Sequence, residues 1–232
     1  MIAPEKFEVL TFDCYGTLID WETGILAALR RVLSSHEKSL PDSEILELYG
    51  EFEAGAEAGP YQKYQEVLTA VVCHFGGHLG FTPTSNETIS LVQGLPTWQP
   101  WPDTVAALQR LQSRFCLAVI SNIDDDLFAK TRDLLGVGFA HVITAQQAEC
   151  YKPGLRIFHH ALAKLKVPPN KVLHIGQSLY HDVQPAQALG ISTVWLNRPS
   201  RRANVGAVRS AHATPDLEVS NMETLAGTLL SM

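Results

Sequence analysis

The sequence predicts an α/β protein, a doubly wound parallel sheet with an inserted helical cap domain. Three observations lead to this fold class. Short β-rich segments alternate with helical patterns over the second part of the chain, which is typical of strands joined by crossover helices. These segments carry mainly apolar residues without a strict polar alternation, which indicates strands covered on both faces. One further strand precedes a long stretch, residues 19–95, that has helical periodicity only.

The first strand is the segment EVLTF at residues 8–12. Four helical segments are expected after it: residues 21–35, a helix opened by Asp42 and Ser43, residues 61–75 and residues 84–93. The Pro-rich segment PTWQPWP at 96–102 then marks the return to the sheet. We therefore expect residues 1–18 and 97–232 to form the α/β catalytic core and residues 19–96 to form the cap.

The remaining core alternates helix and strand. The expected helices are residues 103–112, 127–135, 157–165 and 185–189. The expected strands are residues 116–120, 141–144, 172–175 and 191–196. Asp103 is expected to cap the first of these helices, and Gly190 to end the last.

Composition excludes several classes of protein. The chain has 232 residues, enough for one core with a small insert. Its net charge of −6 argues against a nucleic-acid or anionic-membrane partner. The four cysteines form no CxxC pair, and no leader-like or membrane-spanning apolar run is present, so we expect a cytoplasmic protein. The apolar faces of the predicted cap are compatible with a homodimer.

Polar residues follow four of the predicted strands. They are Asp13, Ser121 with Asn122, Lys152, and the segment GQSLYHD at residues 176–182. In a doubly wound sheet, the carboxyl ends of the strands meet at one crevice, where ligands bind. The topology therefore brings these residues together as candidates for one site.

Each of these residues has a plausible chemical role. Asp13, held at a strand end, could act as a nucleophile that forms an ester later cleaved by water. Thr17 could donate to that carboxylate, and Lys152 could keep it ionised and attract an anion. Asp182 could position Lys152 and the hydrolytic water. Taken alone, however, an aspartate after a strand is more often a turn former.

The donors after the second core strand suit an anionic substrate. Ser121 and Asn122 could bind a substrate carboxylate or an oxyanion. A Ser-Asn pair after a strand is also a common helix cap, so it is the ordered set at successive strand ends that favours catalysis.

The segments FDCYGTL, SN, YKP and GQSLYHD, in this order and spacing, resemble the four motifs of the haloacid dehalogenase superfamily. The resemblance covers essentially the whole chain, including the position of the cap. It implies a nucleophile at Asp13 and the second-, third- and fourth-motif residues at Ser121, Lys152 and Asp182. Ser178 and Tyr180, within the last motif, are expected to border the substrate.

Two positions depart from the phosphatases of that superfamily. These usually carry a second aspartate two residues after the nucleophile, which protonates the leaving alkoxide, and a further carboxylate near a magnesium ion. Here the two positions hold Tyr15 and Gln177. A halide needs no proton to leave, and Tyr15 could line an apolar pocket around it, so we expect a small carboxylic-acid substrate and no metal cofactor.

DCYGTL is similar to the first motif of the type II 2-haloacid dehalogenases, and the longer stretch DCYGTLIDWETG resembles the L-azetidine-2-carboxylate hydrolases. The first resemblance implies cleavage of a carbon–halogen bond at C2. The second implies opening of a strained ring with an amine as leaving group. The cap arginine that dehalogenases use to receive the halide has no counterpart between Val32 and Gln109, and Phe158 replaces a usual tyrosine. An acidic, aromatic cap would suit a cationic leaving group; its residues are Glu53, Tyr61 and Tyr64.

Two other functions remain open. A magnesium-dependent phosphatase could hold its metal with Asp13, the Tyr15 carbonyl and Asp182. A non-catalytic relative could bind a carboxylate metabolite or a protein in the same pocket. Near the C-terminus, a basic loop is expected to be solvated; its arginines are Arg198, Arg201, Arg202 and Arg209.

Overall fold

The computed structural model, which describes residues 2–200 and 211–231, contains a six-stranded sheet in the order β3-β2-β1-β4-β5-β6. All neighbouring strands are parallel, as predicted. The strands are β1 (Val9–Phe12), β2 (Cys116–Ser121), β3 (His141–Thr144), β4 (Val172–Gly176), β5 (Ser192–Leu196) and β6 (Leu217–Val219).

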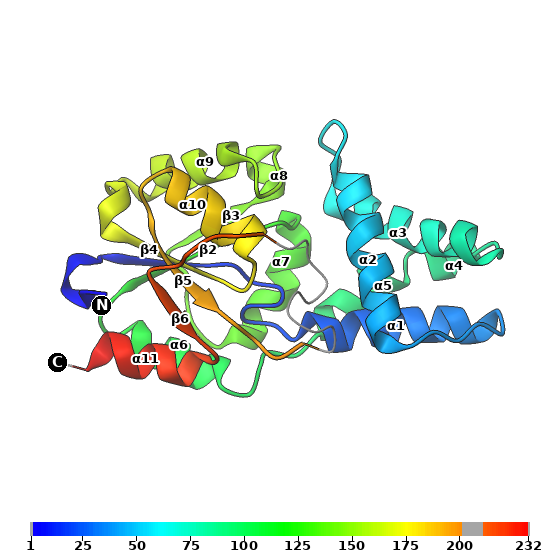
Figure 1. Ribbon diagram of the computed structural model, residues 1–232, viewed down its shortest axis with the longest axis horizontal. Coiled ribbons are helices and arrows are strands. Elements are labelled where there is room, and N and C mark those ends of the chain that lie inside the picture. Colours follow the sequence, from blue (N-terminus) through cyan, green and yellow to red (C-terminus); the bar gives the residue numbers. More distant parts are fainter. Residues whose placement is uncertain (1, 201–210, 232) are drawn as a thin grey trace.

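Helices cover both faces of this sheet, which confirms the doubly wound architecture. In Figure 1, α8, α9 and α10 lie above the sheet, and α6 and α11 pack together below it. The core helices are α6 (Thr104–Leu111), α7 (Asp125–Arg132), α8 (Ala145–Ala148), α9 (Leu155–Leu165), α10 (Gln184–Ala188) and α11 (Met222–Leu230). Short 3-10 turns occupy Pro4–Lys6, Leu95–Thr97, Asp133–Leu135 and Pro169–Lys171, and a π-helical turn, η5, spans Leu179–Val183.

The central strands are buried on both sides. Every residue of β1 and of β4 is buried, which accounts for their mainly apolar sequences. The two polar side chains among them, Thr11 and His174, lie 2.9 Å apart and hydrogen-bond to each other. The order of the strands along the sheet reverses between β1 and β4. The backbone N–H of Asp13 donates to the carbonyl of Ile175 at 2.9 Å, so the segments that follow these two strands start side by side at the edge where ligands bind.

The five helices between β1 and α6 pack mainly against one another, beside the sheet in Figure 1. We call them the helical block: α1 (Trp21–Ser35), α2 (Asp42–Glu57), α3 (Tyr64–Leu79), α4 (Ser85–Thr88) and α5 (Ser90–Gly94). Helix α1 has the predicted bounds because the Asp20 carboxylate accepts a hydrogen bond from the N–H of Thr23, a local N-cap. Within the described ranges, no helix is both long and apolar enough to cross a membrane.

Two helices of this block differ from expectation. The helix predicted from residue 61 begins at Tyr64, because the carboxylate of Asp124, from the core, accepts hydrogen bonds from the N–H groups of Tyr64 and Gln65 at 3.0 Å each. The helix predicted over 84–93 is divided at Ile89 into α4 and α5.

The prediction for Arg198 was wrong. This side chain is buried, and its guanidinium donates to both oxygens of Asp103 at 2.9 Å and to the carbonyl of Thr17 at 3.1 Å. Asp103 therefore binds Arg198 and the N–H of Met222 at 2.6 Å, and its side chain does not cap α6. The ion pair anchors the loop after β1. Arg201, Arg202 and Arg209 lie outside the described residues.

Candidate active site

Three charged side chains meet at the end of β1. The ammonium of Lys152 lies 2.7 Å from an oxygen of Asp13 and 2.6 Å from an oxygen of Asp182, and it also donates to the carbonyl of Ile120 at 3.0 Å. All three charged side chains are buried. The structure thus brings together the predicted nucleophile, the predicted lysine and the predicted acid of the last motif.

The pKa values of the three charged groups depend on two opposing effects, burial and the attraction between opposite charges. Burial raises the pKa of Asp13, and Lys152 opposes that rise. Burial also works against the charged form of Lys152, but the two carboxylates outweigh it and raise the pKa of the lysine. Lys152 and His174 together overcome burial at Asp182 and hold its pKa below the ordinary range. The lysine therefore remains a cation that orients both acids.

Thr17 fixes the second oxygen of Asp13. Its hydroxyl donates to that oxygen at 2.6 Å and accepts from the N–H of Gln177 at 2.9 Å. The turn between them needs Gly16, which has a φ of 93° and whose added Cβ would lie 2.9 Å from the Trp21 ring. Each carboxylate oxygen of Asp13 thus has its own donor, and the group is held in one orientation.

Ser121 and Asn122 have different surroundings. The Oγ of Ser121 is buried and has no hydrogen-bond partner among residues 2–200 and 211–231, although it lines the cavity at Asp13. Asn122 also lines this cavity, but its amide is occupied: it donates to the carbonyl of Lys152 at 3.1 Å and accepts from that residue's N–H at 2.7 Å. Ser121 therefore fits the predicted role of a donor to substrate, whereas Asn122 holds the backbone of Lys152.

Tyr15 turns its hydroxyl away from the acids. The phenol hydrogen-bonds to the hydroxyl of Thr131 at 2.8 Å, and its ring packs edge-on against Trp98 with centroids 6.1 Å apart. Burial raises its pKa well above the ordinary value, so it stays neutral. The ring of Tyr15 lines the cavity as predicted, but its hydroxyl is committed elsewhere.

The last motif forms a tight turn around Asp182. The N–H of Ser178 donates to Asp182 at 3.2 Å, and the hydroxyl of Ser178 accepts from the N–H of His181 at 2.9 Å. Gly176 leaves the room for this turn, since an added Cβ would lie 2.4 Å from the Asp182 side chain. Ser178 lines the cavity, but Tyr180, predicted to border the substrate, lines a neighbouring pocket instead.

His174 is a neighbour of the site that the sequence analysis did not identify. This buried residue of β4 lies 3.2 Å from an oxygen of Asp182 through Nε2 and 2.9 Å from the hydroxyl of Thr11 through Nδ1. An imidazole in an apolar strand gives no local signal of such a contact. It contacts the same oxygen of Asp182 that Lys152 binds, and it does not line the cavity.

The helical block supplies the opposite wall. Glu53 accepts hydrogen bonds from the hydroxyls of Tyr49 at 2.9 Å and Tyr64 at 2.5 Å. Burial raises the pKa of Glu53 to about 7, although the two hydroxyls lower it. Glu57, one turn further along α2, and Trp21 complete this wall. Tyr49, Glu57 and Trp21 were not predicted, although Glu57 lies four residues after Glu53 and hence on the same helix face.

The resulting cavity is small, about 40 Å³. Its polar wall consists of Asp13, Lys152 and Asp182 on the core side, and of Glu53 and Glu57 on the side of the block. A space of this size fits only a small reacting group.

No described arginine of the helical block reaches the cavity. Arg30 pairs with Asp42 on the surface, and Arg31 donates to the carbonyl of Ala27. The side facing Asp13 is therefore acidic.

The donor set fits a magnesium ion poorly. Mg²⁺ prefers several oxygen ligands in octahedral geometry, usually including carboxylates. Here the carboxylates of Asp13 and Asp182 are both bound by Lys152, and the neutral Gln177 stands beside them. Among the described residues, no group of three or more histidine, cysteine or acidic side chains is arranged to hold a metal.

The raised pKa of Glu53 gives a stability prediction. The folded-state value is about 7, against 4.5 for the ordinary side chain, so the folded protein binds the proton more tightly. That stabilisation is fully present below the unfolded value and is lost as the pH rises through 7. Glu53→Gln is therefore expected to stabilise the protein at pH 8.5 by up to about 3 kcal/mol, roughly 6–12 °C in melting temperature, and to have little effect at pH 4.

Melting curves at the two pH values measure this effect. Glu51→Gln, an exposed change on the same helix, is the matched control and should shift neither curve. Equal effects of Glu53→Gln at both pH values would contradict the assigned pKa.

Comparison with known proteins agrees with this geometry. The family model described as haloacid dehalogenase-like hydrolase matches residues 7–190. (S)-2-haloacid dehalogenase H-109 of Pseudomonas putida is 25% identical and covers 97% of this chain and 99% of its own length. Haloacetate dehalogenase H-2 of Moraxella sp. (strain B) is 24% identical over 95% of this chain and 97% of its own.

A similar solved structure is the L-2-haloacid dehalogenase from Xanthobacter autotrophicus. It has a TM-score of 0.83 and 20% sequence identity, and the match covers 97% of this chain and 99% of that one. The likeness confirms the fold. Together with the family match over most of the chain, it confirms the family expected from the four motifs: the protein is an enzyme that belongs to the haloacid dehalogenase-like hydrolases.

Proposed function

We propose that this enzyme hydrolyses the bond between C2 of a small carboxylic acid and an electronegative substituent, through an ester on Asp13. The observation that carries the proposal is the state of Asp13. It is buried, each of its oxygens has one donor, and the residue two positions later is a tyrosine with its hydroxyl turned away. The dehalogenases among the relatives support the same chemistry.

The reaction has two steps. The unpaired hydroxyl of Ser121 donates to the substrate carboxylate, and an oxygen of Asp13 attacks C2. The bond from C2 to the substituent breaks, and the substituent leaves with the electron pair. Water then attacks the carbonyl carbon of the ester, which releases the 2-hydroxy acid and a proton and restores the Asp13 carboxylate.

The other residues of the site assist these steps. Lys152 stabilises the negative charge that develops on the ester oxygen during hydrolysis. Asp182 holds Lys152 in place. We infer that the helical block acts as the cap over Asp13, since Glu53, Glu57 and Tyr64 line the same cavity.

This mechanism needs no acid beside Asp13. A halide leaves as a stable anion, whereas an alkoxide requires a proton, and Tyr15 has its hydroxyl bound to Thr131. The residues that the core contributes to the site therefore suit a chlorinated or fluorinated carboxylic acid as substrate. The acidic wall of the block favours a second class of leaving group, a protonated amine such as that of a strained ring, because Glu53 and Glu57 would attract it.

Halide release from 2-chloropropionate and fluoroacetate in the presence of EDTA tests the proposal. We expect release at the same rate with EDTA and with added magnesium. Release only with magnesium, or magnesium-dependent hydrolysis of p-nitrophenyl phosphate at a higher rate, would favour the phosphatase. Azetidine-2-carboxylate belongs in the same panel, and binding without turnover of any compound would indicate a non-catalytic protein.

A further inference from the structure

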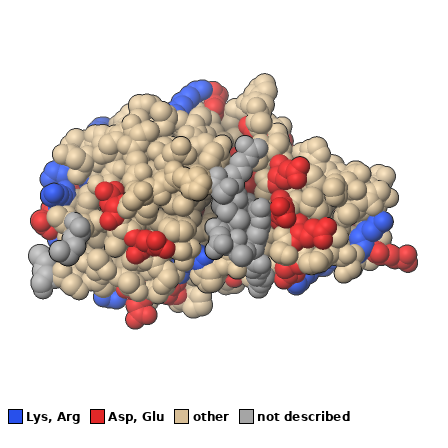
Figure 2. All heavy atoms as spheres, viewed as in Figure 1, with Lys and Arg blue, Asp and Glu red and all other residues tan. Residues whose placement is uncertain are grey.

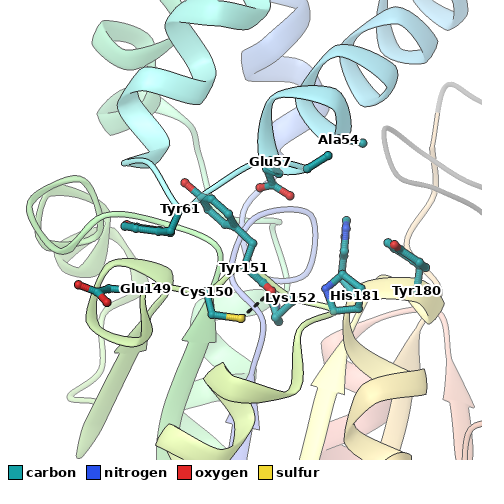
Figure 3. A pocket seen from close by; sticks show the side chains of 12 residues that line it. Ala54, Glu57, Tyr61, Glu149, Cys150, Tyr151, Lys152, Tyr180 and His181 are labelled. Carbon is teal, nitrogen blue, oxygen red and sulfur yellow. Dashed lines mark hydrogen bonds between the residues drawn. The ribbon is translucent and has the colours of Figure 1, made fainter.

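A second pocket adjoins the catalytic cavity. It lies between the end of α2, with the loop that follows it, and the core segments that carry Tyr151 and His181 (Figure 3). Its volume is about 340 Å³. Glu57, Lys152 and His181 line both this pocket and the catalytic cavity, so a substrate held at Asp13 can extend into it.

Aromatic rings form much of its wall. Tyr61 and Tyr151 lie with ring centroids 5.4 Å apart, and Tyr180 and His181 with centroids 4.9 Å apart. The hydroxyl of Tyr151 donates to the carbonyl of Gln62 at 2.8 Å, which fixes its ring. Faces of tyrosine rings attract cations.

Glu57 provides the carboxylate. Burial and the charge of Glu53 raise the pKa of Glu57 well above the ordinary value, so an ammonium bound beside it would favour its ionised form. In Figure 3 its carboxylate points from the end of α2 into the space between Tyr151 and His181. Glu57 accepts no hydrogen bond and forms no ion pair with any residue in the ranges 2–200 and 211–231. It lies deep in the protein but keeps some contact with solvent.

The other charged groups of the pocket do not offset Glu57. Lys152 is already bound by Asp13 and Asp182. Glu149 pairs with Arg156 at the exposed edge and points away from the pocket in Figure 3. Among the described acidic and lysine side chains that line the pocket, Glu57 is therefore the one left without an ion pair.

The charged side chains around the pocket are also mainly acidic. Burial, and then the charges of Asp124, Asp125, Glu149 and Glu66, raise the pKa of Tyr61 to about 12. Figure 2 shows acidic side chains gathered over the helical block on the face in view, and the net charge of the chain is −6. Such a field draws cations toward the pocket.

We propose that this pocket binds a cationic nitrogen group of the substrate, between Glu57 and the rings of Tyr61, Tyr151 and Tyr180. The inference rests on the proposed function and narrows its substrate class. The substrate is a carboxylic acid that reacts at C2 on Asp13 and carries an ammonium group several bonds further along its chain. Bound there, the ammonium forms an ion pair with Glu57 and packs on aromatic faces.

Binding of non-reacting probes tests this without any turnover. We expect 6-aminohexanoate to bind the intact protein at least about tenfold more tightly than heptanoate, a neutral-tailed probe of matching length, by titration calorimetry at pH 8. Glu57→Gln should abolish that preference, and Tyr61→Leu should reduce it about threefold. Glu149→Gln is the matched acidic control and should leave it unchanged. Melting curves confirm that each variant is folded.

Equal binding of the two probes, no binding of either, or a preference that survives Glu57→Gln would overturn the proposal. Kinetics separate it from the proposed function. If 2-chloro-6-aminohexanoate has a higher kcat/KM than 2-chloroheptanoate, whose neutral tail has the same length, and Glu57→Gln removes the difference, both the proposed function and the cation pocket hold. Turnover of both compounds at equal kcat/KM overturns the cation pocket alone. If 6-aminohexanoate is preferred but no chlorinated acid is turned over in a reaction that requires Asp13, the ester mechanism alone is overturned.

Discussion

Asp13→Asn is expected to lower turnover by at least about 10⁴-fold, because an amide cannot act as the nucleophile that forms the ester. The change is nearly isosteric. Lys152 keeps its bond to Asp182, and Thr17 can still bond to residue 13, so the variant should fold. Its loss of activity then reports the chemistry of one carboxylate.

The measurement is product formation by the purified variant at saturating substrate. Asp126→Asn, an exposed acid of α7, is the matched control and should keep full activity. A variant at residue 13 that retains more than about one hundredth of the wild-type rate would be inconsistent with covalent catalysis through Asp13.

Lys152→Met should have the second-largest effect, on stability as well as on activity. Removing the ammonium leaves the carboxylates of Asp13 and Asp182 buried without a cation, and breaking a buried ion pair in this way costs about 3–5 kcal/mol. For a chain of this size, that corresponds to a fall of roughly 6–20 °C in melting temperature at pH 7.5.

The same variant should respond to pH in a defined direction. In the wild type, Lys152 and His174 depress the pKa of Asp182, so the stability contributed by its ionised form is present above the ordinary aspartate value and is lost as the pH falls. In the variant both acids can be neutralised by protons, and the gap to the wild type should narrow toward pH 4.

Denaturant unfolding at pH 7.5 and pH 4.5 measures the difference in unfolding free energy between the wild type and Lys152→Met. Lys171→Met, which removes a half-exposed surface ion pair with Glu8, should cost less than about 1 kcal/mol at either pH. A Lys152→Met protein as stable as the Lys171→Met protein would show that the buried cluster is not held together as described.

Much of the core could be predicted because its signals are local. Strands β1 and β4 read as apolar runs since both of their faces are buried. Parallel strands end at one edge of a sheet, so Asp13 and Asp182 could be placed together from chain order alone. The core side of the site could be predicted because most of its residues come soon after the ends of strands.

What could not be predicted depends on contacts between distant segments. Asp124 sets the start of α3 from the core, and Arg198 is buried only because Asp103 lies opposite it. Strand β6 and helix α11 were not predicted. Strand β6 is held by its pairing with β5, and α11 is held by its packing on α6, so neither is set by its local sequence alone. The sequence analysis named Glu53 and Tyr64 as part of an acidic, aromatic cap, but their hydrogen bond depends on how α2 and α3 pack.

The fate of oxygen from water tests the central claim most directly. A single turnover of 2-chloropropionate in H₂¹⁸O, with enzyme in excess, is followed by mass spectrometry of the peptide that contains Asp13 and of the 2-hydroxy acid. Because water attacks the ester at the carbonyl carbon of Asp13, the ¹⁸O should appear in Asp13 and the product should be unlabelled. Label in the product hydroxyl and none in Asp13 would show that water attacks C2 directly, which contradicts the ester mechanism.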